Sequence, residues 1–211
     1  MKLVLATKNK NKIIEIRNKF SGMPDLELIP QTDFPNSPDV IEDGSTYEEN
    51  ARKKALLIAD FTKLPVMADD SGLEVEALGK RPGVYSARYG DDRFSDTERN
   101  LLLLKEMQNI PGDKRNAKFI CVIALHLSGN EIHTVRGECD GIISFSLKGK
   151  NGFGYDPIFF VPEYRCTMAE LSIDVKNRIS HRALALDRAR EILLNYLKLL
   201  HPPLAPPIEG G

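Results

Sequence analysis

The 211-residue chain has few of the features that mark disulfide-rich, zinc-binding or membrane proteins. Its three cysteines form no C-x-x-C pair and show no ligand-like spacing with the four histidines, which argues against a zinc site and a disulfide framework. The apolar start at residues 1–6 is too short for a signal peptide, and no apolar run approaches membrane-spanning length. We therefore expect a cytoplasmic protein without a membrane partner.

An excess of charge of one sign is also missing. The formal net charge is −1, so no global basic field points to nucleic acid as a partner. The phosphate-binding motif G-x-x-x-x-G-K-[ST] is absent from the whole sequence, which excludes a Walker-type nucleotide site. Apolar residues make up 42% of the chain, enough for one large domain or two lobes with an ample core.

Strand and helix patterns mix along the chain. Apolar runs predict strands at 2–6, 26–29, 64–68, 119–127, 132–139 and 157–161, with 141–145 as a further strand. Ser128-Gly129-Asn130 is a hairpin signal. Helices are predicted after residue 12, after a capping box that pairs either Ser45 with Glu48 or Thr46 with Glu49, from residue 96, and from Ser180. We expect a mixed α/β sheet in residues 1–200 and a disordered Pro/Gly-rich tail at 201–211.

An acidic junction follows the predicted strand that ends at Ala68. Asp69, Asp70, Ser71 and Gly72 would then lie where the strand leaves the core, at the rim of a cleft. Adjacent carboxylates repel, and a divalent cation offsets that repulsion, but an Asx-turn closing the strand explains the same residues. If the strand stays regular, Asp69 and Asp70 face opposite ways.

Cations gather at two predicted helix starts, where they oppose the helix dipole. An anionic ligand would offset that cost, and free amides at a helix N-terminus suit phosphate. The alternative is solvated surface charge. The residues are Thr7, Lys8, Asn9, Lys10, Asn11 and Lys12 in the first segment, and Ser180, His181 and Arg182 in the second, with Lys176 just before it.

Two further segments carry weaker signals. Glu42 lies in a loop ahead of the capped helix that contains Lys54, and it would give the aspartates a second magnesium ligand. Taken singly, both side chains read better as solvated surface groups. In residues 151–157, glycines flank Phe153 and Tyr155, so a ring would stack on a flat ligand, or the aromatics would belong to the core.

Together, these segments resemble the inosine triphosphate pyrophosphatase family. The matches are residues 5–12, 68–73 continuing into 82–89, 153–157 and 180–182, in order along nearly the whole chain. Lys80 and Arg81 occupy a turn where a further glycine is common, and the stretch after Tyr89 looks shorter than in some members, but neither departure touches a motif residue. The resemblance implies a homodimer, and two lobes around a long, highly twisted mixed β-sheet with the active-site cleft between them. It also implies hydrolysis of deaminated purine nucleoside triphosphates (dITP, ITP, XTP) to monophosphate and pyrophosphate.

Roles for the residues follow from this resemblance as a hypothesis. Glu42 and Asp70 hold Mg²⁺, and Asp70 also accepts the proton of the water that attacks the α-phosphorus, with Asp69 in a supporting role. The triphosphate is held by residues 7–12, Lys54, Ser71 and Lys176. Phe153 stacks on the base, Gly154, Tyr155 and Asp156 shape its edge, and His181 and Arg182 donate to the 6-oxo group.

Two other functions remain open at this point. A phosphomonoesterase of the aspartyl-phosphate type would use Asp69 or Asp70 as nucleophile, although its usual D-x-D pattern is missing. A non-enzymatic nucleotide or RNA-binding module would use the aromatics and lysines, but acids lining a polyanion site need a metal.

Overall fold

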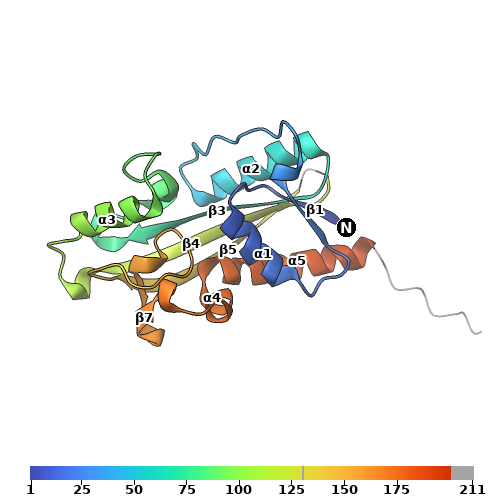
Figure 1. The fold of residues 1–211 in the computed structure, drawn as a ribbon. Coiled ribbons are helices and arrows are strands. Elements are labelled where there is room, and N and C mark those ends of the chain that lie inside the picture. Colours follow the sequence, from blue (N-terminus) through green and yellow to red (C-terminus); the bar gives the residue numbers. More distant parts are fainter. Residues whose placement is uncertain (130, 201–211) are drawn as a thin grey trace, which may run out of the picture.

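The computed structural model describes residues 1–129 and 131–200 (Figure 1). Seven strands form one sheet in the order β2-β1-β3-β4-β5-β6-β7, which confirms the mixed α/β class. β1 is parallel to both of its neighbours, and all later pairs are antiparallel. The strands are β1 (Lys2–Leu5), β2 (Glu27–Pro30), β3 (Val66–Val75), β4 (Asn116–His126), β5 (Ile132–Ile143), β6 (Phe159–Val161) and β7 (Cys166–Thr167). The predicted tail and Asn130 of the hairpin turn lie outside the described residues.

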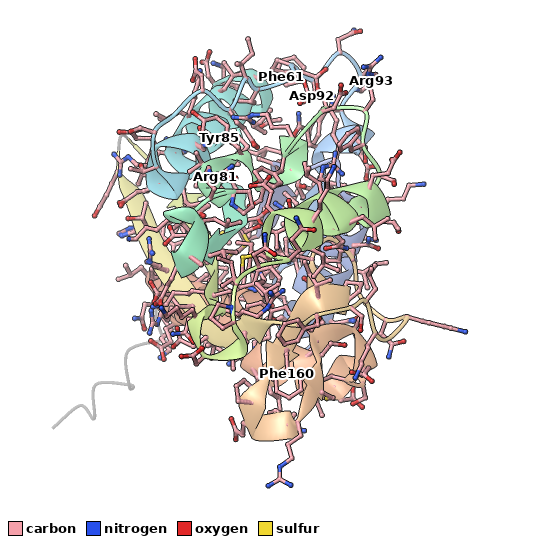
Figure 2. The ribbon with its side chains drawn as sticks, turned by 90° about the vertical axis from the view of Figure 1, so that its left-hand side faces the viewer. Phe61, Arg81, Tyr85, Asp92, Arg93 and Phe160 are labelled. Atoms are coloured by element: carbon pink, nitrogen blue, oxygen red, sulfur yellow. The ribbon has the colours of Figure 1, made fainter. Side chains whose placement is uncertain are left out.

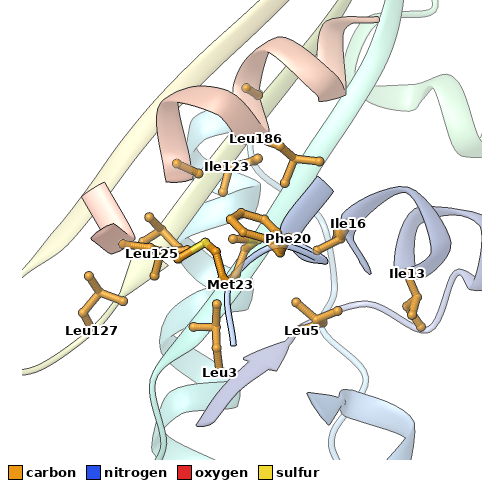
Figure 3. Close-up of a cluster of buried hydrophobic side chains, with 14 of the residues drawn as sticks. Leu3, Leu5, Ile13, Ile16, Phe20, Met23, Ile123, Leu125, Leu127 and Leu186 are labelled. Carbon is orange, nitrogen blue, oxygen red and sulfur yellow. The ribbon is translucent and has the colours of Figure 1, made fainter. Parts of the chain in front are cut away.

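Helices cover both faces of the sheet. α2 (Tyr47–Thr62) packs on one face, and α1 (Lys10–Phe20) and α5 (His181–Leu200) pack on the other (Figure 1). Side chains alternate along each strand, so Met67 joins the cluster under α1 and α5 while Val66 joins the cluster under α2. Figure 3 shows Phe20 of α1 lying among Ile123, Leu125 and Leu186 in the first of these clusters.

A third apolar cluster fills the end of the molecule that carries α3 (Asp96–Glu106). It packs α3 and the far halves of β3, β4 and β5 together with the segment around α4 (Ile173–Ile179). Figure 2 views the molecule from this end, with Arg81 and Tyr85 on one side and Phe160 of β6 on the opposite side. Short 3₁₀ helices are η1 (Gln31–Asp33), η2 (Glu76–Leu78), η3 (Gly83–Arg88), η4 (Gly112–Lys114), η5 (Asp156–Ile158), η6 (Pro162–Tyr164) and η7 (Met168–Glu170).

The helix starts near the cleft are fixed by local side-chain caps. Thr46 and Glu49 form the capping box of α2, which decides between the two registers that the sequence allowed. Asn9 caps α1 by accepting from the backbone N–H of Asn11 and Lys12. Ser180 accepts from the N–H of Ala183 and so caps α5.

Several predicted strand boundaries were wrong, among them the start of β6, because Pro157 and Ile158 belong to η5. β3 does not end at Ala68 but runs without a break through Asp69, Asp70, Ser71 and Gly72 to Val75, so neither a strand end nor an Asx-turn lies there. These acids pair with β4 throughout, and distant cations and amides compensate their burial. Residues 141–143 are the end of β5 rather than the start of a separate strand.

A gap in the strand pairing opens the site. β1 pairs with β3 only at Val66 and Met67. Beyond Met67, no strand of the described chain pairs with that edge of β3, apart from an isolated bridge between Glu74 and Pro82. The segment with Asp69 and Asp70 therefore lies in the middle of β3, which pairs with β4 along one edge and has no strand partner along the other edge at these residues.

Gly137 of β5 brings α5 unusually close to the sheet. A Cβ at this position would lie 2.1 Å from the carbonyl oxygen of His181 and 2.4 Å from the backbone nitrogen of Ala185. The first turn of α5 therefore rests on β5 at a distance that only glycine permits.

Candidate active site

A cavity of about 460 Å³ opens beside the unpaired edge of β3. Segments from both ends of the molecule and from both sheet faces contribute to its walls. Of the residues selected from sequence, it is lined by Thr7, Lys8, Asn9, Lys12, Glu42, Lys54, Asp70, Ser71, Phe153, Gly154, Tyr155, Asp156, Lys176, His181 and Arg182.

Lys10 and Asn11 are not among the residues that line the cavity. Both lie on the exposed side of the first turn of α1. Because Asn9 already binds the amides of Asn11 and Lys12, these two amides are engaged within the protein. Side chains, notably Lys8 and Lys12, are therefore what this segment presents to the cavity.

Asp70 faces the α2 side of β3 and is buried. Asn50 donates to its Oδ2 at 3.0 Å, and the ammonium of Lys54 lies 3.7 Å from its Oδ1. Lys54 also forms an ion pair with Glu42. Burial raises the pKa of Asp70, Lys54 opposes the rise, and the carboxylate of Glu42 adds to it.

Asp69 faces the opposite side and does not line the cavity. Its Oδ2 lies 2.9 Å from Nζ of Lys12 and accepts from Nε and Nη2 of Arg182, each at 3.3 Å. Burial alone would raise the pKa of Asp69, but Lys12 and Arg182 outweigh it and hold that pKa far below its usual range. The two aspartates thus face opposite ways, as a regular strand requires.

A buried chain of alternating charges extends from Asp69. Arg182 donates to Glu15 at 2.6 Å and to Ser71 at 2.8 Å, and Lys176 lies 3.0 Å from the other oxygen of Glu15. Lys176 also donates to Asp156 at 2.5 Å. Burial would raise the pKa of Glu15, but Arg182 and Lys176 lower it.

Phe153 lies beside these cations at the cavity wall. Nζ of Lys176 is 4.7 Å from the centre of its ring, and the guanidinium carbon of Arg182 is 5.5 Å away. The α3 end holds the same loop, because Asp96 accepts from Gly154 N–H at 2.7 Å and Asn100 donates to the Gly154 carbonyl at 2.9 Å. The ring is therefore held from both sides of the cavity.

His181 is buried and stacks on Phe119, with ring centres 4.7 Å apart. Burial, with Arg182 and Lys176 nearby, holds the pKa of His181 well below its usual range. Burial and these cations favour the neutral imidazole, and its Nδ1 has no hydrogen-bond partner within residues 1–129 and 131–200.

Sequence reasoning missed several residues of the site. Glu15 carries no local signal, because its partners lie more than 150 positions away in the chain. Asn50 did carry one, since it shares a helix face with Lys54 four residues on. Neither Glu15 nor Asn50 lines the cavity itself; the lining residues that were not selected include Gln31, Asp39, Ser86, Asp96, Arg99 and Phe119.

Comparison with known proteins assigns the chain to a family. A model described as the Ham1 family matches residues 3–192. The chain belongs to the Ham1 family. Within it, a dITP/XTP pyrophosphatase of Geobacter sulfurreducens is 50% identical over 185 residues, covering 88% of this chain and 92% of the relative. A dITP/XTP pyrophosphatase of Desulforamulus reducens is 49% identical over 193 residues, covering 92% and 96%.

A solved Ham1 structure supports the same assignment. The HAM1 protein of Coxiella burnetii superposes with a TM-score of 0.85 at 41% identity, covering 92% of this chain and 99% of that one. The resemblance noted from the motifs and the expected fold class are therefore confirmed. In the described part of this Ham1 chain, no helix is both long and apolar enough to cross a membrane.

Proposed function

We propose that the chain hydrolyses dITP, ITP and XTP to the nucleoside monophosphate and pyrophosphate. The observation that carries this proposal is the cavity, which is lined both by the carboxylates of Glu42 and Asp70 and by five cations, namely Lys8, Lys12, Lys54, Lys176 and Arg182. Its Ham1 relatives named as dITP/XTP pyrophosphatases support the same reaction. They favour it over an aspartyl-phosphate phosphomonoesterase and over a module that only binds nucleotides.

The residues of the cavity fit a bound Mg²⁺. Within the described residues no three His, Cys, Asp or Glu side chains form a ligand cluster. Mg²⁺ needs fewer, because it takes one or two carboxylates and completes its shell with water and phosphate oxygens. The ammonium of Lys54 pairs with Glu42 and lies 3.7 Å from Oδ1 of Asp70, so the two carboxylates already share one cation, which supports the proposal of a second cation there. Glu42 and Asp70 would hold the metal, which supplies charge neutralisation on the phosphate oxygens when bound.

Asp70 is the general base of this proposal. Its Oδ1 is the oxygen that faces Lys54, whereas Oδ2 is occupied by Asn50. A water held against the carboxylate of Asp70 gives up its proton as its oxygen attacks the α-phosphorus, and pyrophosphate leaves. Asp69 has no such role, because its engaged oxygen faces Lys12 and Arg182 on the other side of the strand.

The remaining side chains bind the substrate. Lys8, Lys12 and Lys54, with the hydroxyls of Thr7 and Ser71, form the wall for the triphosphate. Phe153 stacks on the purine. Neutral His181 and the guanidinium of Arg182 donate to the 6-oxo group of hypoxanthine or xanthine, where ATP presents an amino group. Buried donors that lose their acceptor reject such an analogue by ~10⁴-fold.

One assay tests the reaction directly. Pyrophosphate and phosphate release are measured from ITP, dITP, XTP, GTP and ATP, with and without Mg²⁺. We expect pyrophosphate from ITP, dITP and XTP but not from ATP, and only with metal. Release of phosphate in place of pyrophosphate would support the phosphomonoesterase, and binding without turnover would support the nucleotide-binding module.

The family resemblance adds a homodimer to this proposal, and the sequence adds a location in the cytoplasm. Sedimentation of the purified chain checks the oligomeric state, with a species of twice the mass of 23.6 kDa expected.

A further inference from the structure

One buried side chain contacts both segments that carry the carboxylates of the proposed reaction, although it is not among the residues that line the cavity. Asn50 is fully buried in the first turns of α2. Its Oδ1 accepts from the backbone N–H of Gly44 at 2.8 Å, and its Nδ2 donates to Oδ2 of Asp70 at 3.0 Å. It therefore bridges the loop that follows Glu42 and the middle of β3.

The chemistry of the two partners fixes the orientation of this amide. The N–H of Gly44 can only donate, so the atom it meets must be the carbonyl oxygen of Asn50. The nitrogen of the same amide then faces the carboxylate of Asp70, which accepts. A flipped amide would lose both bonds and would place two acceptors against each other.

The backbone on both sides of Asn50 is also held in place. The capping box of Thr46 and Glu49 sets where α2 begins, and the N–H of Asn50 donates to the carbonyl of Thr46 at 3.2 Å. A Cβ on Gly44 would lie 2.7 Å from Oδ1 of Asn50 and 2.9 Å from Cβ of Glu49. The loop can approach this closely only because residue 44 has no side chain.

Because of this contact, the two oxygens of Asp70 have different partners. Oδ2 is occupied by Asn50, which leaves Oδ1 on the side of Lys54 and Glu42. Arg88 donates to the carbonyl of Glu42 at 2.6 Å and holds the loop from its other side. We propose that Asn50 is a positioning residue that fixes the carboxylate of Asp70, and its spacing from Glu42, for the reaction. This inference rests on the proposed function.

The expected size of the effect follows from how such supports act. Outer partners that orient a metal-binding group change metal affinity or activity by ~10- to 100-fold when removed. A displacement of about 1 Å at a reacting group costs ~10²-fold in rate. Asn50 acts through Asp70, so substrate binding by Lys8, Lys12 and Phe153 changes little.

Asn50→Asp is the sharpest test because it keeps the shape and the acceptor for Gly44 but replaces the donor to Asp70 by a like charge. Asn50→Ser is measured beside it, in case the first variant does not fold. Asn18→Asp, at an exposed position of α1, carries the same charge change and is the matched control. We expect kcat on ITP to fall ~10²-fold in both Asn50 variants, with KM changed by less than about threefold and the control unchanged.

A second readout does not depend on turnover. Mn²⁺ binding is titrated by calorimetry on the folded variants in the presence of the α,β-imido analogue of ITP. We expect the Mn²⁺ dissociation constant to rise ~10-fold or more in the Asn50 variants and to stay constant in Asn18→Asp.

The possible results distinguish a failure of the Asn50 role from a failure of the proposed pyrophosphatase activity. A wild-type chain that releases no pyrophosphate from any deaminated purine triphosphate refutes the proposed function, and the role of Asn50 with it. An active wild type whose folded Asn50 variants match it in kcat and in Mn²⁺ affinity overturns the role of Asn50 alone. So does a loss of rate that is accounted for entirely by unfolded protein in thermal melts.

Discussion

The two faces of β3 treat two identical neighbouring side chains in opposite ways. On the side of α1 and α5, Asp69 meets Lys12 and Arg182, and its pKa is held far below the usual range despite burial. On the side of α2, burial of Asp70 prevails over Lys54, and its pKa is raised. Burial acts on both carboxylates, so the number of cations within reach accounts for the opposite directions of the two pKa shifts.

The side of β3 that carries Asp69 also has more hydrogen bonds between side chains than the side that carries Asp70. Arg182 directs four hydrogen bonds at Asp69, Glu15 and Ser71. Asp70 lines the cavity, with one oxygen held by Asn50 and the other facing Lys54. On the Asp69 face of β3, hydrogen bonds and ion pairs connect the strand to α1 and α5. On the Asp70 face, fewer cations lie near the buried carboxylate.

The largest effect is expected from Asp70→Asn, which keeps the shape of the proposed general base and removes its basicity. We expect kcat on ITP to fall ~10³-fold or more, while nucleotide binding measured by calorimetry changes little. The rate is followed by pyrophosphate release. A residual rate above about a tenth of the wild type would remove Asp70 from the role of base.

Asp69→Asn tests the other face through stability. Lys12 and Arg182 would keep their charges in a buried site without their carboxylate, so we expect the free energy of unfolding to fall by about 3 kcal/mol. Urea denaturation measures it. Asp187→Asn, which breaks an exposed ion pair with Lys19, is the matched control and should cost less than about 1 kcal/mol. Equal losses in the two variants would contradict the comparison.

Arg182→Ala tests whether a residue on the Asp69 side of β3 also selects the base. Removal of a donor to the 6-oxo group should lower the ratio of kcat/KM for ITP over ATP by ~10²-fold. The ratio is measured on ITP, XTP, GTP and ATP, with Arg188→Ala at an exposed position of the same helix as control. An unchanged ratio in Arg182→Ala would show that other groups read the base.

The smallest effect is a change in acid sensitivity. The lowered pKa of Glu15 means that its stabilising contribution is present above its ordinary value of 4.5 and is lost as pH falls through the folded-state pKa. Glu15→Gln should therefore flatten the loss of unfolding free energy below pH 4.5, by up to about 1.4 kcal/mol per pH unit. Urea denaturation in EDTA between roughly pH 5 and pH 2 measures the slope, and parallel slopes would refute the role of Glu15.

Local signals predicted most of the elements. The Thr46–Glu49 capping box, the cap at Ser180 and the helix face with Asn50 and Lys54 each involve residues within four positions of one another. The residue at which β3 ends could not be predicted from such local signals. Two carboxylates after an apolar run resemble a turn until their partners are known, and the partners of Asp69 come from positions 12 and 182.

The cavity shows the same limit. Its cationic and aromatic segments were recognisable because each carries an unusual residue type at the end of an element. Glu15 was not, because a single acid within an amphipathic helix resembles any solvated surface residue. Its role emerges only where α4 and α5 bring Lys176 and Arg182 against it.

The missing side chain of Gly137 determines where part of the cavity wall lies. Because the carbonyl of His181 would lie 2.1 Å from any Cβ there, the helix that carries His181 and Arg182 takes its height above the sheet from this one residue. Position 137 is outside the cavity and would contact no substrate. A substitution there would nevertheless act on the proposed base-reading residues, since a single methyl group would displace His181 and Arg182 together.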